Sequence, residues 1–302
     1  MRPALALTAV LALAAPTASH AATAPAAVIA DPPQDKAHPA GMIAFALPTH
    51  GMRINAMLYT AAGAGPHPTV LLLHGLPGNE QNLDLARAIQ RDGWNVLTLH
   101  YRGSWGSPGK YSFAHCLEDA EAAVAWLRAP SAEAAPHIDS ARIVVVGHSL
   151  GGFVAGYTAG HDPWLMGAVL ISAARIGAGF TSLTREQVVK VLEANIQNAD
   201  GMRTLGDATA EGLADEAIKN GPAWNLARFA PTLASHPLLI VTSDDGLGPG
   251  DEALAKSVEA LPGARVSRAH FATDHGYDDQ RIALETAVIG WLETLPGAPA
   301  WR

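Results

Sequence analysis

Cysteine is almost absent from this chain of 302 residues, because Cys116 is the only one. A single thiol cannot form an intramolecular disulfide, so the fold must depend on packing alone. Cys116 falls within a stretch of helical periodicity, 113–128, where a lone cysteine is ordinarily a small core residue. We therefore assign it no chemical role.

Charge is also scarce, since charged residues make up 16% of the chain and sum to a net charge of −8. Without a basic cluster, neither nucleic acid nor an anionic membrane surface is expected as a partner. The sequence contains no His-Glu-x-x-His, Cys-x-x-Cys or Gly-x-Gly-x-x-Gly pattern, so we expect no metal and no cofactor. Hydrophobic residues make up 49%, enough for the core of one globular domain.

The first 21 residues have the composition of a cleavable secretory signal. Arg2 provides a positive start, and residues 4–15 form an apolar run too short to span a membrane. Small residues at both ends of 19–21 predict cleavage after Ala21, with export to a periplasm or the medium and no stable membrane span. An alanine-rich disordered tail is the alternative. Residues 22–40, rich in alanine and proline, are expected to be a flexible lead-in.

Apolar runs alternate with helical periodicity along most of the chain, which predicts an α/β fold with a mostly parallel sheet flanked by helices. Short continuous apolar runs are typical of strands buried on both faces. Two segments at the start, 42–47 and 52–60, alternate instead and predict an antiparallel pair. The other expected strands are 69–73, 95–99, 142–146, 167–171, 237–242 and 265–269, and the expected helices are 79–92, 113–128, 150–160, 251–261 and 278–295.

Residues 173–236 interrupt this alternation. They are polar, acidic and helix-prone, at 184–195 and 209–219, and have no convincing strand. We expect a helical cap inserted into a domain that spans 41–302, lying over the crevice at the carboxyl ends of the strands. Surface helices elsewhere on the domain are the alternative.

One segment joins a strand to a helix in the way that a catalytic serine requires. Residues 147–151 read Gly-His-Ser-Leu-Gly and follow the β-branched run 144–146. This is the order of a nucleophile elbow, in which a strained turn lifts the serine hydroxyl out of the sheet beside a helix N-terminus. Ser149 is therefore the candidate nucleophile.

A serine hydroxyl needs a base, and the base needs a carboxylate that orients it. Among 13 histidines, His275 is the candidate base because it lies in a glycine-containing loop after the last expected strand. His270, at the end of that strand, is the alternative. Asp244 and Asp245 both follow strand 237–242, and either can be the acid.

The oxyanion of an acyl-transfer intermediate needs two backbone donors. Leu150, the residue after the nucleophile, is expected to provide one of them. Residues 74–78, His-Gly-Leu-Pro-Gly, follow strand 69–73, and Leu76 is the candidate for the other because Pro77 has no N–H. Taken alone, 74–78 is more simply a tight Gly/Pro turn.

Together these motifs resemble an α/β-hydrolase-fold serine hydrolase, over residues 42–295. Residues 101–109, Tyr-Arg-Gly-Ser-Trp-Gly-Ser-Pro-Gly, are similar to the loop after the fourth strand in prolyl-oligopeptidase-like and acyl-peptidase-like members. The turn Asp-Gly-Leu-x-Pro resembles the usual acid turn of this fold, which favours Asp245. The resemblance implies hydrolysis of an ester or amide through an acyl-enzyme.

The sequence shows no β-propeller of the kind that sieves peptides in true prolyl oligopeptidases, so we favour an esterase. The expected function is that of a secreted serine hydrolase acting on a small acyl ester or a short peptide, with Ser149, His275 and Asp245 as its triad. A small aminoacyl peptidase or amidase is the first alternative. A non-catalytic binding protein on the same fold is the second.

Overall fold

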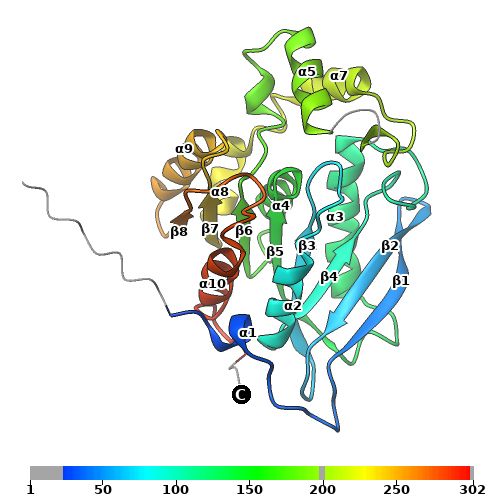
Figure 1. Ribbon diagram of the computed structural model, residues 1–302, viewed down its shortest axis with the longest axis vertical. Helices are drawn as coiled ribbons and strands as arrows, with labels where there is room; N and C mark the ends of the chain where they lie inside the picture. The colour runs from blue at the N-terminus through cyan, green and yellow to red at the C-terminus, as the bar shows by residue number, and fades with distance from the viewer. Residues whose placement is uncertain (1–22, 197–200, 300–302) are drawn as a thin grey trace, which may run out of the picture.

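The computed structural model describes residues 23–196 and 201–299 (Figure 1). Its strands are β1 Gly41–Thr49, β2 Met52–Thr60, β3 His67–Leu73, β4 Asn95–Leu99, β5 Ile138–His148, β6 Gly167–Ile171, β7 Pro237–Thr242 and β8 Arg265–His270. They form one eight-stranded sheet in the order β1-β2-β4-β3-β5-β6-β7-β8. β2 is antiparallel to both of its neighbours, and the other adjacent strands are parallel. The expected antiparallel pair at 42–47 and 52–60 is confirmed.

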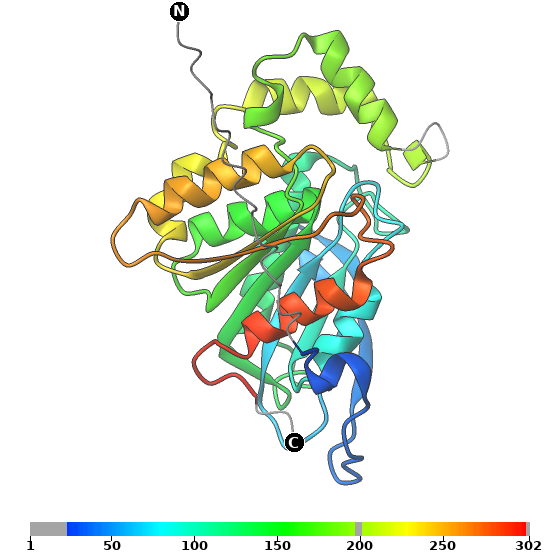
Figure 2. The same cartoon turned by 60° about the vertical axis from the view of Figure 1, so that its left-hand side comes forward.

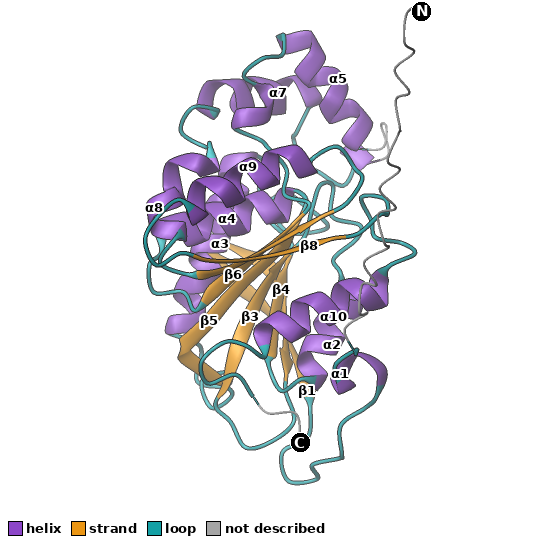
Figure 3. Cartoon of the chain, turned by 90° about the vertical axis from the view of Figure 1, so that its left-hand side faces the viewer, coloured by secondary structure: helices purple, strands orange, loops and turns teal. Residues whose placement is uncertain are grey.

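Helices cover both faces of this sheet. The helices of the described residues are α1 Ala26–Ile29, α2 Leu83–Arg91, α3 Phe113–Arg128, α4 Leu150–His161, α5 Arg185–Asn195, α7 Ala210–Asn220, α8 Ala230–Leu233, α9 Gly248–Glu259 and α10 Arg281–Leu292, with short 3₁₀ turns η1 Ala178–Phe180 and η2 Leu226–Phe229. Figure 3 shows α1, α2 and α10 on one face and α3, α4, α8 and α9 on the other. The mostly parallel sheet flanked by helices, predicted from the sequence, is confirmed.

The apolar strands supply two cores, one on each face of the sheet. Leu71 and Leu73 of β3 pack on the side of α3 and α4, and Val70 and Leu72 pack on the side of α2 and α10. Side chains alternate along a strand, so a strand buried on both faces favours apolar residues at successive positions. This explains the continuous hydrophobic run at residues 70–73 of β3.

Helix α2 begins later than the expected start at residue 79. Asn82, immediately before it, has a φ of 55°, which is left-handed backbone that a right-handed helix cannot contain. Residues 79–82 are therefore loop, close to the carboxyl end of β3.

The residues between β6 and β7 fall into two parts. Figures 1 and 2 show α5 and α7 packed together above the carboxyl ends of the strands. α8 and η2 instead pack against α4, within the layer of helices that flanks the sheet. Helical periodicity predicts these helices, but it does not indicate which surface each one covers.

The segment before the sheet, expected to be a flexible lead-in, contains the short helix α1. Ala27 of α1 is buried, and Arg91 Nε donates to its carbonyl oxygen at 2.6 Å. α1 contacts both α2 and α10, and its small Ala27 side chain is buried against them. The expected signal, residues 1–21, lies outside the described residues. Within 23–196 and 201–299, no helix is long and apolar enough to cross a membrane.

Candidate active site

Ser149 stands in a strained turn between β5 and α4. Its φ of 57° and ψ of −120° are rare for a residue with a side chain, and its N–H donates to the carbonyl oxygen of Ile171 at 2.9 Å. A Cβ on Gly147 would lie 2.0 Å from the carbonyl oxygen of Gly151, and a Cβ on Gly151 would lie 2.0 Å from that of Leu73. The two glycines of the motif are therefore required for the turn to form.

His275 and Asp245 are in direct contact. His275 Nδ1 lies 2.7 Å from Asp245 Oδ2, and Asp245 Oδ1 accepts the N–H of Leu247 at 2.8 Å. Burial acts to raise the pKa of Asp245, but the hydrogen bonds from His275 and Leu247 outweigh it and lower the pKa to about 2. Since an ionised carboxylate can only accept, Nδ1 carries the proton and Nε2 keeps its lone pair free for the serine.

The two alternative residues pair with each other instead. Asp244 Oδ1 lies 3.4 Å from His270 Nε2, and both side chains are more than half exposed. In contrast, the Asp245 side chain is only 4% exposed. Adjacent residues in a turn point in different directions, and here only Asp245 faces His275.

His148, the residue before the serine, fixes the histidine loop. Its Nε2 lies 2.8 Å from the carbonyl oxygen of His275, and the two rings are 4.7 Å apart. Burial, together with the nearby His275, lowers the pKa of His148 to about 4, so the ring is neutral near pH 7. A carbonyl can only accept, so His148 donates from Nε2. The sequence motif places His148 beside Ser149, but nothing in it predicts this bond.

Arg281 holds the same loop from the other side. Its guanidinium makes two hydrogen bonds to Asp84, of 2.7 and 2.6 Å, and one to Asn82 Oδ1 of 3.0 Å. A further bond of 3.0 Å reaches the carbonyl oxygen of Gly276, next to His275. Arg281 thereby ties the histidine loop to the start of α2. The partners are nearly 200 positions apart, so no local sequence signal could have predicted the contact.

Residues 74–78 lie against the serine. A Cβ on Gly75 would be 3.0 Å from Ser149 Cβ and 3.5 Å from Ser149 Oγ. Among the described residues, no acceptor is recorded for the N–H of Leu76 or of Leu150, and no partner for the Ser149 hydroxyl. Catalytic hydrogen bonds often tighten only around a substrate. The N–H groups of Leu76 and Leu150 are therefore available to bind an oxyanion, as an oxyanion hole requires.

The part of the chain that the structure describes has no evident metal-binding site. No group of three or more His, Cys, Asp or Glu side chains there is arranged to hold a metal ion. Cys116 is buried, and burial raises the pKa of its thiol well above the usual value, which makes a thiolate unfavourable.

Comparison with known proteins agrees with this architecture. Residues 68–187 match a family model described as the alpha/beta hydrolase fold. The chain has the α/β-hydrolase fold. A segment of 123 residues is also 32% identical to the alpha/beta hydrolase domain-containing protein WAV2 of Arabidopsis thaliana. That match covers 40% of this chain and 38% of the plant protein, so the similarity concerns only part of each.

Solved structures share the α/β-hydrolase fold over most of the chain. EstE1, a thermostable carboxylesterase cloned from a metagenomic library, has a TM-score of 0.60 and 23% identity, over 83% of this chain and 89% of its own. Est1E from Butyrivibrio proteoclasticus has a TM-score of 0.63 and 16% identity, over 83% and 97%. The acylaminoacyl peptidase of Pyrococcus horikoshii has a TM-score of 0.60 and 15% identity, over 84% of this chain but 41% of its own. At these identities the likeness is one of fold.

Proposed function

We propose that this chain is a serine hydrolase that cleaves carboxylic esters through an acyl-enzyme on Ser149. The observation that carries the proposal is the 2.7 Å contact between His275 and Asp245, in a loop that His148 fixes beside the strained serine. A base already oriented by a buried carboxylate has little use in a protein that only binds. We also propose export, on the composition of residues 1–21.

The first half of the reaction forms the acyl-enzyme. Ser149 Oγ attacks the ester carbonyl carbon while His275 Nε2 takes the hydroxyl proton. The Asp245 carboxylate stabilises the resulting imidazolium through Nδ1–H. The carbonyl oxygen becomes an oxyanion between the N–H groups of Leu76 and Leu150. The C–O bond then breaks, and the imidazolium gives its proton to the departing alcohol.

The second half releases the acid. A water molecule attacks the acyl carbon and passes its proton to His275, forming a second oxyanion in the same place. When this intermediate collapses, the bond to Ser149 Oγ breaks and the serine recovers its proton from His275. The carboxylic acid departs, and every group returns to its starting state.

One comparison supports esters over amides. The structure named as a carboxylesterase matches over 89% of its own length, whereas the peptidase matches over 41% of its length. A small aminoacyl peptidase or amidase is the alternative that the test below separates.

The test compares hydrolysis of 4-nitrophenyl butyrate with that of an aminoacyl 4-nitroanilide. We expect the purified protein to turn over the ester, and Ser149→Ala to lower kcat by on the order of 10³ or more. Ester hydrolysis by the Ser149→Ala protein at the same rate as by the wild type would refute the proposal. Turnover of the anilide alone would replace the esterase with an amidase.

A further inference from the structure

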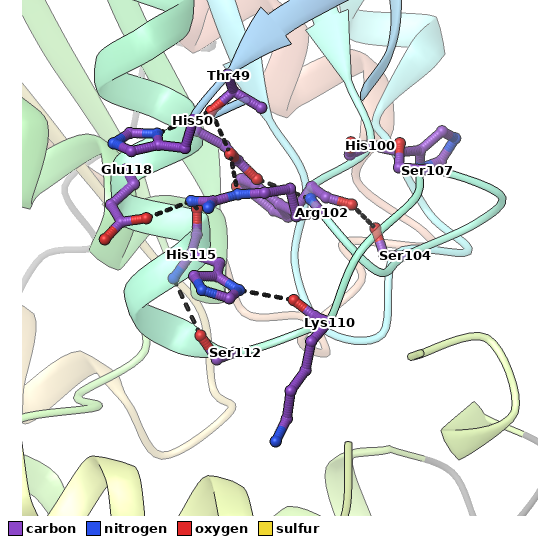
Figure 4. Close-up of polar contacts among 12 residues, drawn as sticks. Thr49, His50, His100, Arg102, Ser104, Ser107, Lys110, Ser112, His115 and Glu118 are labelled. Atoms are coloured by element: carbon purple, nitrogen blue, oxygen red, sulfur yellow. Dashed lines mark hydrogen bonds and ion pairs between the residues drawn. The ribbon is translucent and has the colours of Figure 1, made fainter. Parts of the chain in front are cut away.

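The loop between β4 and α3, residues 101–111, is held rigidly at its root. Figure 4 shows the Arg102 side chain reaching from this loop toward Glu118. Its Nε donates to Asp119 Oδ1 at 2.6 Å, and its backbone N–H donates to Asp119 Oδ2 at 2.7 Å. The Asp119 side chain is fully buried and also accepts the Thr49 hydroxyl at 2.7 Å. A buried and fully paired network of this kind is rigid, so the loop tip keeps a defined position.

At that tip, the side chain of Trp105 holds residues 74–78, which we call the oxyanion loop. Trp105 Nε1 donates to the carbonyl oxygen of Pro77 at 2.8 Å. A Cβ on Gly78 would lie 3.0 Å from the same nitrogen, so the indole lies directly on the loop. Pro77 follows Leu76, the proposed oxyanion donor, so the indole fixes the backbone one residue away from the working N–H.

The main chain of Trp105 is held by the inserted segment between β6 and β7. Its N–H donates to the carbonyl oxygen of Thr204 at 3.1 Å. Beside this bond, Gly206 N–H donates to the Gly103 carbonyl oxygen at 2.5 Å, and Tyr111 N–H donates to the Gly206 carbonyl oxygen at 2.9 Å. Trp105 has a φ of 47°, a conformation that is strained for a bulky residue and depends on such surrounding bonds.

We propose that Trp105 is a positioning residue that couples the cap helices α5 and α7 to the oxyanion loop. The cap segment 204–206 sets the backbone of Trp105, and the indole N–H then sets Pro77 and, through it, the Leu76 donor. Docking of the cap thereby favours the oxyanion geometry. This inference rests on the proposed function, and it predicts that the rate depends on a segment that does not carry the triad.

The first test is Trp105→Phe, which keeps a six-membered aromatic ring and removes the N–H donor together with the five-membered ring that carries it. With 4-nitrophenyl butyrate we expect kcat to fall roughly 10-fold to 100-fold, because a displaced oxyanion donor acts in the transition state, while KM changes less than about 3-fold. Inhibition by a trifluoromethyl ketone should weaken by a similar factor, because its serine adduct places an oxyanion in the same hole. Trp164→Phe is the matched control, since Trp164 is 79% exposed.

A Trp105→Phe protein that behaves like Trp164→Phe would overturn the inference, and so would a raised KM with unchanged kcat. Equal thermal unfolding midpoints for the two variants would exclude simple loss of the fold as the cause. A wild-type protein that does not hydrolyse the ester at all would refute the proposed function instead, and this is measured first.

The second test is a double-mutant cycle with the cap. Glu216 on α7 accepts the N–H groups of Phe113 and Ala114 at 2.9 and 3.0 Å, which anchors the cap to the start of α3. Glu216→Gln weakens this anchor. We expect it to lower kcat about 3-fold to 10-fold in the wild-type background and less than about 2-fold in the Trp105→Phe background, where the coupling is already broken. An equal factor in both backgrounds, or no effect in either, would refute the coupling.

Discussion

Replacing Asp245 with asparagine is expected to abolish most of the catalytic rate without unfolding the protein. The carboxylate accepts His275 Nδ1–H at 2.7 Å and the N–H of Leu247 at 2.8 Å. Asparagine has the same shape, but it carries no charge and presents an NH₂ group. It therefore favours the His275 tautomer with the proton on Nε2, which cannot take a proton from Ser149.

The expected loss in kcat is on the order of 10⁴, or about 5 kcal/mol of transition-state stabilisation. Asp244→Asn is the matched control, because it makes the same chemical change one residue away. Asp244 contacts His270 at 3.4 Å in a pair that is more than half exposed. Exposed pairs of this kind contribute little, so kcat should change less than about 2-fold.

The pH dependence adds a second test of the same residue. The pKa of Asp245 is lowered to about 2, so its stabilising contribution is present above the unfolded value of 3.8 and is lost only as the pH falls through about 2. The carboxylate therefore stays ionised from about pH 5 to about pH 9, and the rate deficit of Asp245→Asn should persist over this range.

The assay is the steady-state hydrolysis of 4-nitrophenyl butyrate, with thermal unfolding as the check on folding. The reasoning is refuted if Asp244→Asn loses as much activity as Asp245→Asn. It is also refuted if Asp245→Asn keeps more than about a tenth of the wild-type kcat.

Four further predictions concern stability and the position of the histidine loop. Gly151→Ala should lower the free energy of unfolding by more than about 3 kcal/mol, because its Cβ would lie 2.0 Å from a backbone oxygen. Gly290→Ala, in α10 with no atom within 4 Å of the new Cβ, should raise it by about 0.5–1 kcal/mol in denaturant titrations. Burial raises the pKa of Asp251 to about 8, so the folded state holds a proton that the unfolded state releases near 3.8, and wild-type stability should fall relative to Asp251→Asn as the pH rises between these values. Arg281→Lys keeps the charge but loses the forked contacts to Asp84, so kcat should fall about 10-fold.

Each of these predictions has a clear contrary result. A Gly151→Ala protein as stable as the wild type would mean that the turn can relax, and a destabilised Gly290→Ala protein would mean that this helix face is crowded. Parallel stability curves for Asp251→Asn and the wild type across pH would show that Asp251 ionises normally. Unchanged kcat in Arg281→Lys would show that other contacts suffice to hold the His275 loop.

The sheet could be predicted because its physical cause is local. Strands such as β3, buried on both faces, favour apolar residues on both, and this leaves a continuous apolar run at 70–73. The role of the glycines around Ser149 could also be predicted from the sequence, because the turn tolerates no Cβ at 147 or 151. Helices α5 and α7 begin directly after Thr184 and Thr209, whose side chains cap them.

The rest of the site depends on contacts between distant segments. Asp244 and Asp245 are equivalent by position, and only the three-dimensional turn directs Asp245 to His275 and Asp244 to His270. The bond from His148 to the His275 carbonyl joins residues more than 120 positions apart. The packing of α8 against α4 likewise follows from the shape of both surfaces, and hydrophobic periodicity does not specify it.

The most direct test of the account is whether Ser149 is an activated nucleophile. The purified protein and its Ser149→Ala variant would be treated with a fluorophosphonate, and the modified peptide would be located by mass spectrometry. We predict one adduct, on Ser149, that is absent from the variant. A folded wild-type protein that takes up no probe, or that takes it up on another residue, would contradict the proposed mechanism.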